Sequence, residues 1–263
     1  MSFQPVIPFT GYTGWTFLKR TMEKQQTALQ STTANQREEA YFRANIGKVT
    51  TAQQLVDDRR LLKVALTAFG LEADLNAKAF VRKVLTDGTE AETALANRMA
   101  DKRYRAFAMA FNFSDPANVS TQMAGFADKV LAIWRTKSFE AAVGDQNNAM
   151  RLALNAEREV GALAKATLGE DTKWFTVMGN TPLRKVFETA LGLPTAFGQL
   201  DIDQQLKVFK TRAQAVFGAQ TVSQFSDPDK MTKLVRIYLV RDEVANGTAG
   251  ASPMQNALTL LAR

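Results

Sequence analysis

Apolar residues recur at spacings of three and four along most of the chain, and the stretches with this pattern end at Gly or begin at Ser, Thr or Asp. Strict alternation of apolar and polar residues, which marks a half-buried strand, is almost missing. The pattern therefore predicts an all-α fold, a multi-helix bundle. The expected helices span residues 15–46, 51–70, 76–87, 90–100, 101–112, 116–142, 145–168, 171–178, 183–191, 201–217 and 228–246, with a short apolar helix over 253–263.

Several helix ends carry recognisable capping residues. Thr51, with Gln54 three residues later, fits a capping box, and Gly70 is placed to stop that helix in the left-handed conformation. A polar cap followed by Pro at the first helical position is expected at three places. These are Ser114-Asp115-Pro116, Thr181-Pro182 and Ser226-Asp227-Pro228.

Two similar segments of the sequence indicate an internal duplication. Residues 61–71 (LLKVALTAFGL) align without gaps on residues 183–193 (LRKVFETALGL), and seven of the eleven pairs are identical. Each copy is followed by a loop, an apolar helix and then an apolar residue two before an Asp, Met99/Asp101 in one and Phe225/Asp227 in the other. We expect two pseudo-symmetric helical units, with Gly70 and Gly192 as equivalent helix ends.

The repeat suggests a division of the chain into five segments that together form one compact body. They are an N-terminal arm and long helix (1–48), the first helical repeat (49–113), connecting helices (114–174), the second helical repeat (175–246) and a flexible C-terminal tail (247–263).

The composition excludes several chemistries. The 263 residues include no His and no Cys, which rules out zinc sites built from those ligands, thiol nucleophiles and Ser-His-Asp catalysis. No stretch resembles a phosphate-binding loop, a signal peptide or a membrane span. We predict no catalytic, cofactor-binding or metal-ligating residue and no cofactor.

The net charge of +7 favours acidic partners, but basic residues stand beside acids along the chain. Arg103-Tyr104-Arg105 could stack on bases, with further positive charge on Lys207, Lys210 and Arg212, although an ordinary amphipathic helix explains both groups better. A basic helical nucleic-acid-binding or regulatory protein is therefore the alternative function, and nucleic acid the less favoured partner.

A cell-wall hydrolase is a weaker alternative, because hydrolysis without His needs paired carboxylates. Adjacent acids on a helix point about 100° apart, so Glu38/Glu39 and Asp57/Asp58 are poor pairs. Asp57 fits a surface ion pair with Arg60, and Asp201 and Asp203 fit a helix start. Glu157 or Glu188 could serve as a cleft acid, and the sequence selects neither.

Both termini carry apolar residues beside segments rich in Pro or Gly. These residues could bind a partner or dock on the same chain, whereas Trp134 and Trp174 fit the core. The candidate interaction surface comprises Phe9, Tyr12, Trp15, Phe17, Met254, Leu258 and Leu261.

Several stretches of the sequence are spread over nearly the whole chain. They are 56–62 with 68–71, 101–104, 150–155 with 158–159, 173–175, and 182–184 through 192–194. These stretches resemble an uncharacterised alphaproteobacterial family, a domain of unknown function often encoded among flagellar genes. The resemblance implies a flagellum-associated role and assigns no catalytic residue.

We therefore expect a non-enzymatic protein that acts through protein contacts in flagellar assembly, structure or regulation. Its partners would be flagellar or other proteins, or further copies of this chain. It would lie in the cytoplasm or be exported through the flagellar apparatus without a cleaved signal.

Overall fold

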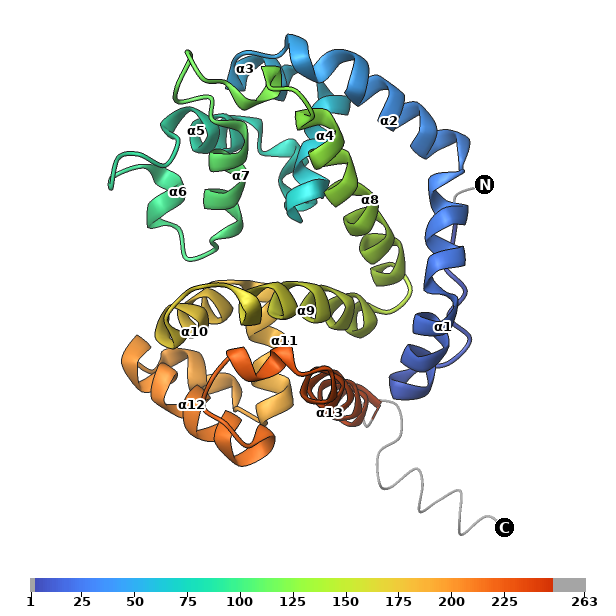
Figure 1. Cartoon of the computed structure of the whole chain (residues 1–263), viewed down its shortest axis with the longest axis vertical. Coiled ribbons are helices and arrows are strands. Elements are labelled where there is room, and N and C mark those ends of the chain that lie inside the picture. The colour runs from blue at the N-terminus through green and yellow to red at the C-terminus, as the bar shows by residue number, and fades with distance from the viewer. Residues whose placement is uncertain (1–2, 248–263) are drawn as a thin grey trace. The chain divides into compact units, whose positions relative to one another are not determined.

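The computed structural model describes residues 3–247, and these residues contain helices and no strand, which confirms the all-α class (Figure 1). The chain divides into two compact units. Unit 1 comprises residues 21–143 with the first five residues, and unit 2 comprises residues 6–20 and everything from residue 144. The boundary between residues 143 and 144 falls inside the predicted connecting segment 114–174. The division also falls within helix α1 (Gly11–Gln30).

Unit 1 is built around a continuous apolar core. Leu62 and Leu66 are fully buried in it, together with aromatic rings such as Phe107 and Phe111, whose centroids lie 5.1 Å apart. Trp134 is also buried, as predicted. The helices of this unit are α2 (Thr33–Asn45), α3 (Ala52–Asp57), α4 (Arg59–Phe69), α5 (Lys78–Asp87), α6 (Leu95–Arg98), α7 (Arg103–Phe111) and α8 (Phe126–Gly144), with 3₁₀ turns at Ile46–Lys48, Glu72–Asn76 and Ser120–Gln122.

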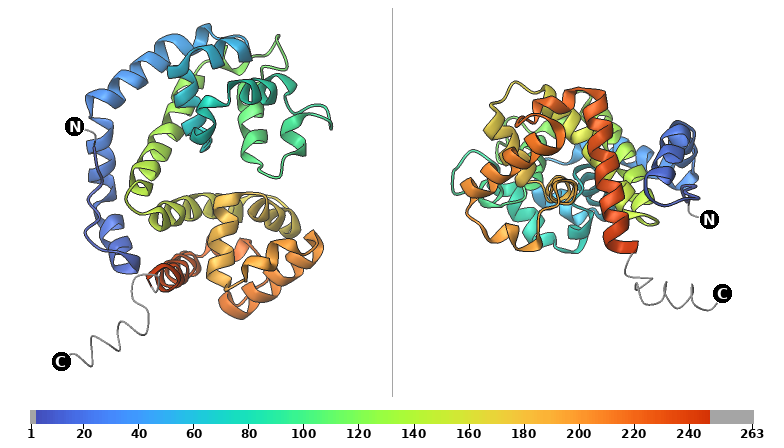
Figure 2. Two further views of the ribbon diagram at one scale, coloured as in Figure 1. Left: turned by 180° about the vertical axis from the view of Figure 1, so that it is seen from behind. Right: turned by 90° about the horizontal axis from the view of Figure 1, so that it is seen from below.

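In unit 2 three helices, α9 (Asn148–Lys165), α11 (Thr181–Leu191) and α13 (Pro228–Gly247), pack on one another (yellow to red in Figures 1 and 2). Trp174 is fully buried, as predicted, and lies against Phe187 and Phe209 with centroids 5.4 and 5.7 Å away. The helices are α9 (Asn148–Lys165), α10 (Glu170–Met178), α11 (Thr181–Leu191), α12 (Ile202–Phe217) and α13 (Pro228–Gly247), with 3₁₀ turns at Thr195–Gln199 and at Ser223–Ser226, the latter called η5.

The two glycines singled out by the repeat end their helices as predicted. Gly70 closes α4 with φ +68°, and Gly192 closes α11 with φ +65°, a left-handed conformation that glycine adopts without a steric penalty. In each case an arginine donates to a carbonyl at the helix end. Arg103 of α7 donates to Gly70, and Arg241 of α13 donates to Ala190 at 2.8 Å. The two arginines come from helices that the predicted repeat equates, but Arg103 lies two residues after Asp101 and Arg241 lies fourteen residues after Asp227, so the duplication stays a prediction.

Three predicted helices differ in the structure because side chains cap the backbone at unforeseen points. The helix expected over 15–46 is two, and the Thr32 hydroxyl caps the second. The helix expected over 51–70 keeps its Thr51–Gln54 capping box, but the carboxylate of Asp58 accepts from the N–H groups of Arg60 and Leu61 and starts a new helix there. The helix expected from residue 116 begins only at Phe126.

The predicted cap at Asp115 closes a turn instead. Its carboxylate accepts from the backbone N–H of Ala117 at 3.0 Å and from the amide of Asn118 at 2.8 Å.

Two other predicted helices also begin at a different residue or have a different cap. The 90–100 helix is only α6, and Asn180 rather than Thr181 caps α11. The remaining predicted helices within 3–247 match to within three residues at each end.

No helix within residues 3–247 combines the length and the apolar character that crossing a membrane requires.

Candidate functional site

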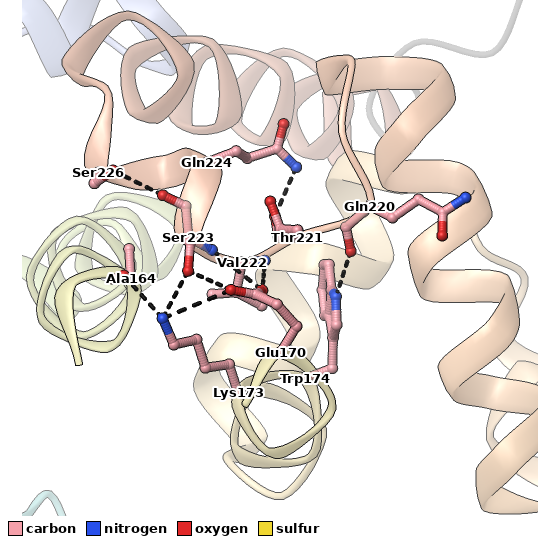
Figure 3. Close-up of polar contacts among 10 residues, drawn as sticks. All are labelled: Ala164, Glu170, Lys173, Trp174, Gln220, Thr221, Val222, Ser223, Gln224 and Ser226. Carbon is pink, nitrogen blue, oxygen red and sulfur yellow. Dashed lines mark hydrogen bonds and ion pairs between the residues drawn. The ribbon is translucent and has the colours of Figure 1, made fainter. Parts of the chain in front are cut away.

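A connected polar group in unit 2 surrounds Lys173 of α10, whose side chain is almost completely buried (Figure 3). Its Nζ donates to the carbonyl of Ala164 at 3.0 Å and to the hydroxyl of Ser223 at 2.6 Å, and it forms an ion pair with Glu170 at 3.7 Å. The three donors of the ammonium group therefore have three acceptors. Lys173 thereby ties the end of α9 to η5.

Glu170 completes this group. Its Oε2 accepts from the backbone N–H of Val222 at 2.7 Å and of Ser223 at 3.4 Å, and the Ser223 hydroxyl donates to Oε1. Burial by itself raises the pKa of this carboxyl, but the hydrogen bonds from Ser223 and Val222 and the charge of Lys173 outweigh that effect and hold the pKa below its ordinary value of 4.5. Glu170 is accordingly a stabilised carboxylate.

A lysine beside a serine is also the arrangement of a nucleophilic dyad, in which the lysine must accept the hydroxyl proton. Here Lys173 donates to Ser223, and the hydroxyl proton points at Glu170, a carboxylate whose lowered pKa makes it a weak base. The geometry is that of a structural contact, which we call the Lys173 cluster and which consists of Lys173, Glu170, Ser223 and the Ala164 carbonyl. Sequence reasoning missed it because Lys173 and Ser223 lie 50 residues apart, and the only signal was the family-like stretch at 173–175.

The lowered pKa of Glu170 predicts a pH-dependent contribution to stability. Because the folded pKa lies below the unfolded value of about 4.5, the contribution is fully present above that pH and is lost as the pH falls through the folded pKa. We expect the difference in unfolding free energy between the wild type and Glu170→Gln to be constant near neutrality and to shrink below pH 4.5. Urea unfolding at a series of pH values measures it, and a pH-independent difference would contradict the prediction.

The charged family-like stretch at 56–62 has a structural role in unit 1. Asp58 caps α4 and also accepts from the Tyr41 hydroxyl at 2.7 Å. Arg60 stacks over the Tyr41 ring at 3.8 Å and pairs with Glu38 at 3.2 Å, so the predicted pair of Arg60 with Asp57 is wrong. Asp57 instead accepts from Gln53. The arrangement joins α2 to α4.

The stretch at 101–104 has a second structural role. Arg103 binds both carboxylate oxygens of Asp101 while donating to the Gly70 carbonyl, and the Tyr104 hydroxyl donates to Asp74 at 2.6 Å. The Tyr104 ring packs edge-on against Phe80 at 5.2 Å. The side chains proposed for base stacking are therefore engaged within the unit.

The acids considered for hydrolysis also have intramolecular partners. Glu157 pairs with Lys19 at 2.6 Å and Glu188 with Arg184 at 2.7 Å. Asp201 caps α12, as predicted. Of the adjacent acids in unit 1, Glu39 pairs with Arg135 and Glu38 with Arg60.

The structure separates the predicted interaction residues by exposure. Phe9 is 54% exposed, whereas Trp15 is only 6% exposed. Tyr12 and Phe17 are half-buried, and the Phe17 ring meets Phe9 edge-on at 6.4 Å. Burial of Trp15 fits docking on the same chain, one of the two alternatives that the sequence left open. Met254, Leu258 and Leu261 lie outside the described residues.

The arm, residues 6–20, approaches α13 closely. The Thr10 hydroxyl, one residue after Phe9, donates to the Glu243 side chain near the end of α13 at 2.8 Å. There Val240 and Val244, one turn apart, are 46% and 63% exposed. We call Phe9, Val240 and Val244 the arm–α13 surface. Sequence reasoning missed the two valines, because the spacing of α13 alone does not distinguish its two apolar faces.

Gly14 makes the close approach of the arm possible. A Cβ atom at this position would lie 1.9 Å from the Phe9 carbonyl oxygen and 2.5 Å from Met150 Cε. We expect Gly14→Ala to displace the arm and to cost about 1–3 kcal/mol of stability, as overpacking does. Urea unfolding measures the loss, with Gly161→Ala in α9 as the control, because nothing lies within 4 Å of a Cβ there. Equal effects of the two substitutions would contradict a tightly docked arm.

Comparisons with known proteins agree with this fold. A family model described as "Protein of unknown function (DUF1217)" matches residues 68–231, which is more than half of the chain. The chain belongs to this family. Its predicted membership of an uncharacterised family is thereby confirmed. The crystal structure of protein AGR_C_984 from Agrobacterium tumefaciens is similar over 92% of this chain and 99% of that chain, with a TM-score of 0.72 and 27% identity. No curated protein matches the chain.

The segment matched by the DUF1217 family model includes the polar contacts described above but not the arm–α13 surface. It contains Arg103, Glu170, Lys173 and Ser223, which fasten the units internally, and it excludes all three residues of the arm–α13 surface. The matched segment thus contains these polar contacts, whereas Phe9, Val240 and Val244 lie outside it.

Proposed function

We propose that the protein acts without catalysis, through protein contacts in flagellar assembly, structure or regulation. The flagellar part rests on the resemblance of stretches such as 101–104 and 173–175 to a family often encoded among flagellar genes. The observation that carries the non-catalytic part is the use of the charged residues in those stretches. Lys173 and Arg103 bind groups of their own units, so that they fasten helices and are not free to meet a substrate.

The arm–α13 surface is the proposed contact. Large apolar side chains exposed together on one surface, with charged residues beside them, are typical of protein-binding sites. Phe9, Val240 and Val244 are each exposed, and the hydrogen bond from Thr10 to Glu243 joins the arm to α13 at residues next to Phe9 and Val244 in the chain. A partner with a complementary apolar surface would bury them.

The test is deletion of the gene followed by complementation. We expect loss of swimming or of filaments on deletion, restored by the wild-type gene and not by a Phe9→Asp/Val244→Asp variant. Thr13→Asp/Ala245→Asp is the matched control, because it adds the same charge at exposed positions of the arm and of α13. An immunoblot verifies equal abundance. Normal swimming and filaments after deletion would overturn the flagellar proposal. Full rescue by the Phe9→Asp/Val244→Asp variant would show that the arm–α13 surface is not the contact.

We also propose that the protein lies in the cytoplasm or passes through the flagellar export apparatus without a cleaved signal. Culture fluid and cells from strains with intact and disabled export are compared by immunoblot. Appearance of the full-length protein outside the cell only with intact export selects the exported form, and retention in both strains selects the cytoplasmic form. Its appearance outside the cell in both strains would contradict this proposal.

A further inference from the structure

The arm is held on unit 2 by contacts at both of its ends and in its middle. The Thr10 hydroxyl donates to Glu243 at 2.8 Å, and Lys19 pairs with Glu157 at 2.6 Å. Between these two contacts the Trp15 side chain is buried. All of them are non-covalent, so unit 2 of a second copy of the chain offers the arm the same partners.

The backbone connects the arm to the rest of unit 2 only through residues 21–143 of unit 1. The arm is therefore a segment near one end of the chain that docks on a body distant from it in the sequence. Two copies of a protein can exchange such a segment by domain swapping, provided that the chain next to it contains a hinge.

The break between α1 and α2 has the properties of such a hinge. Only Ser31 and Thr32 separate the two helices. Thr32 has an extended backbone, with φ −64° and ψ 139°, and rotation of ψ to the helical value of about −42° is part of the change that would join them. Neither residue is Gly or Pro, and the spacing of apolar residues in this segment predicts one continuous helix over 15–46.

The hydrogen bonds that hold the break are local. The Thr32 hydroxyl donates to the Leu29 carbonyl at 2.8 Å, and the side-chain amide of Asn35 donates to the same carbonyl at 2.9 Å. The Thr32 hydroxyl also accepts from the Asn35 N–H at 3.4 Å, which is a long hydrogen bond. A continuous helix would exchange these bonds for backbone hydrogen bonds of its own, so opening the break leaves few polar groups unpaired.

We propose that the arm of one copy binds unit 2 of a second copy, and the reverse, in a dimer that forms when α1 and α2 join into one helix. A helix over residues 11–45 would be about 52 Å long and would carry the arm off its own unit 2. The contacts of Thr10, Trp15 and Lys19 would form again between the two copies, so the dimer requires no surface beyond the one that the arm already occupies. This inference goes beyond the proposed function, because the partner is a second copy of this chain.

Isotope mixing tests the exchange. Equal amounts of unlabelled and ¹⁵N-labelled protein are refolded together at high concentration, and monomer and dimer are separated by size-exclusion chromatography. A carbodiimide then joins the Lys19 amine to the Glu157 carboxylate as an amide, with loss of water. By mass spectrometry we expect about half of the Lys19–Glu157 cross-linked peptides from the dimer to combine one light and one heavy partner, and none of those from the monomer.

Thr33→Pro tests the hinge. Proline suits the first position of α2, and Thr32 before it already has the extended conformation that a following proline favours. The substitution therefore keeps the broken form and opposes a continuous helix. We expect the dimer fraction to fall by roughly tenfold or more, because proline inside a helix is strongly unfavourable. Thr33→Ala, which removes the same exposed side chain, is the matched control and should keep the dimer fraction at least at the wild-type level.

Three outcomes overturn the proposal. They are a wild type that stays monomeric at all concentrations, a dimer whose Lys19–Glu157 cross-links lie within single copies, and equal dimer fractions in Thr33→Pro and Thr33→Ala. Circular dichroism establishes that both variants are folded. Because these readouts need no other protein and no cells, their failure is distinct from a failure of the flagellar proposal, which motility tests.

Discussion

Replacing Lys173 with methionine is expected to lower the free energy of unfolding of unit 2 by about 2–4 kcal/mol. Methionine keeps much of the side-chain volume but removes the donors to the Ala164 carbonyl and the Ser223 hydroxyl. It also leaves Glu170 without its nearby cation. Chemical denaturation followed by tryptophan fluorescence measures the loss, because Trp174 is buried in the same unit.

The exposed Lys185 of α11 provides the matched control. Lys185→Met makes the same chemical change at the surface and should alter stability by about 0.5 kcal/mol or less. The double variant Lys173→Met/Glu170→Gln should lose less than the two single variants added together, since neither charge is then left without the other. Equal effects on stability at positions 173 and 185 would contradict a stabilising role for the buried contacts of Lys173.

Trp15→Ala is expected to lower the stability of unit 2 by about 3–5 kcal/mol, the range for truncating a buried aromatic residue. Trp15 is 6% exposed, and Lys19, which pairs with Glu157 of α9, lies over its ring at 5.6 Å. Loss of the ring should detach the arm. Urea unfolding by circular dichroism measures the change, with amide exchange of α1 to locate it.

Phe9→Ala is the comparison within the same arm. The Phe9 ring is 54% exposed, so its loss should cost about 1 kcal/mol or less and should affect partner binding rather than folding. If the two substitutions destabilise the protein equally, Trp15 does not hold the arm on unit 2 and belongs with the partner-binding residues.

The helix ends show where the residues within one turn were sufficient to predict the structure. The Thr51–Gln54 capping box and the left-handed Gly70 and Gly192 follow from residues within one turn, and the structure has all of them. Asp58 and Asp115 show the limit of such rules. Both are cap-forming residues, yet Asp58 starts a helix where none was expected to begin, whereas Asp115 closes a turn. Asp58 also accepts from Tyr41 of another helix, a contact that no local pattern encodes.

The candidate sites were less predictable than the helices. The sequence singled out Phe9 and Trp15 together, and only packing separates them into an exposed and a buried ring. It also marked 101–104 and 173–175 as family-like stretches, but their roles depend on partners such as Gly70 and Ser223.

The sequence by itself determined the all-α class, most helix positions, the burial of Trp134 and Trp174 and the exclusion of His- and Cys-based chemistry, because periodicity, capping and composition are local or additive properties. Only the tertiary structure decided the two-unit division inside α1, the burial of the Lys173 ammonium with Glu170 and Ser223, and the exposure of Val240 and Val244. These features depend on contacts between residues far apart in the chain. The spacing of residues along one helix does not specify which of its faces another segment will cover.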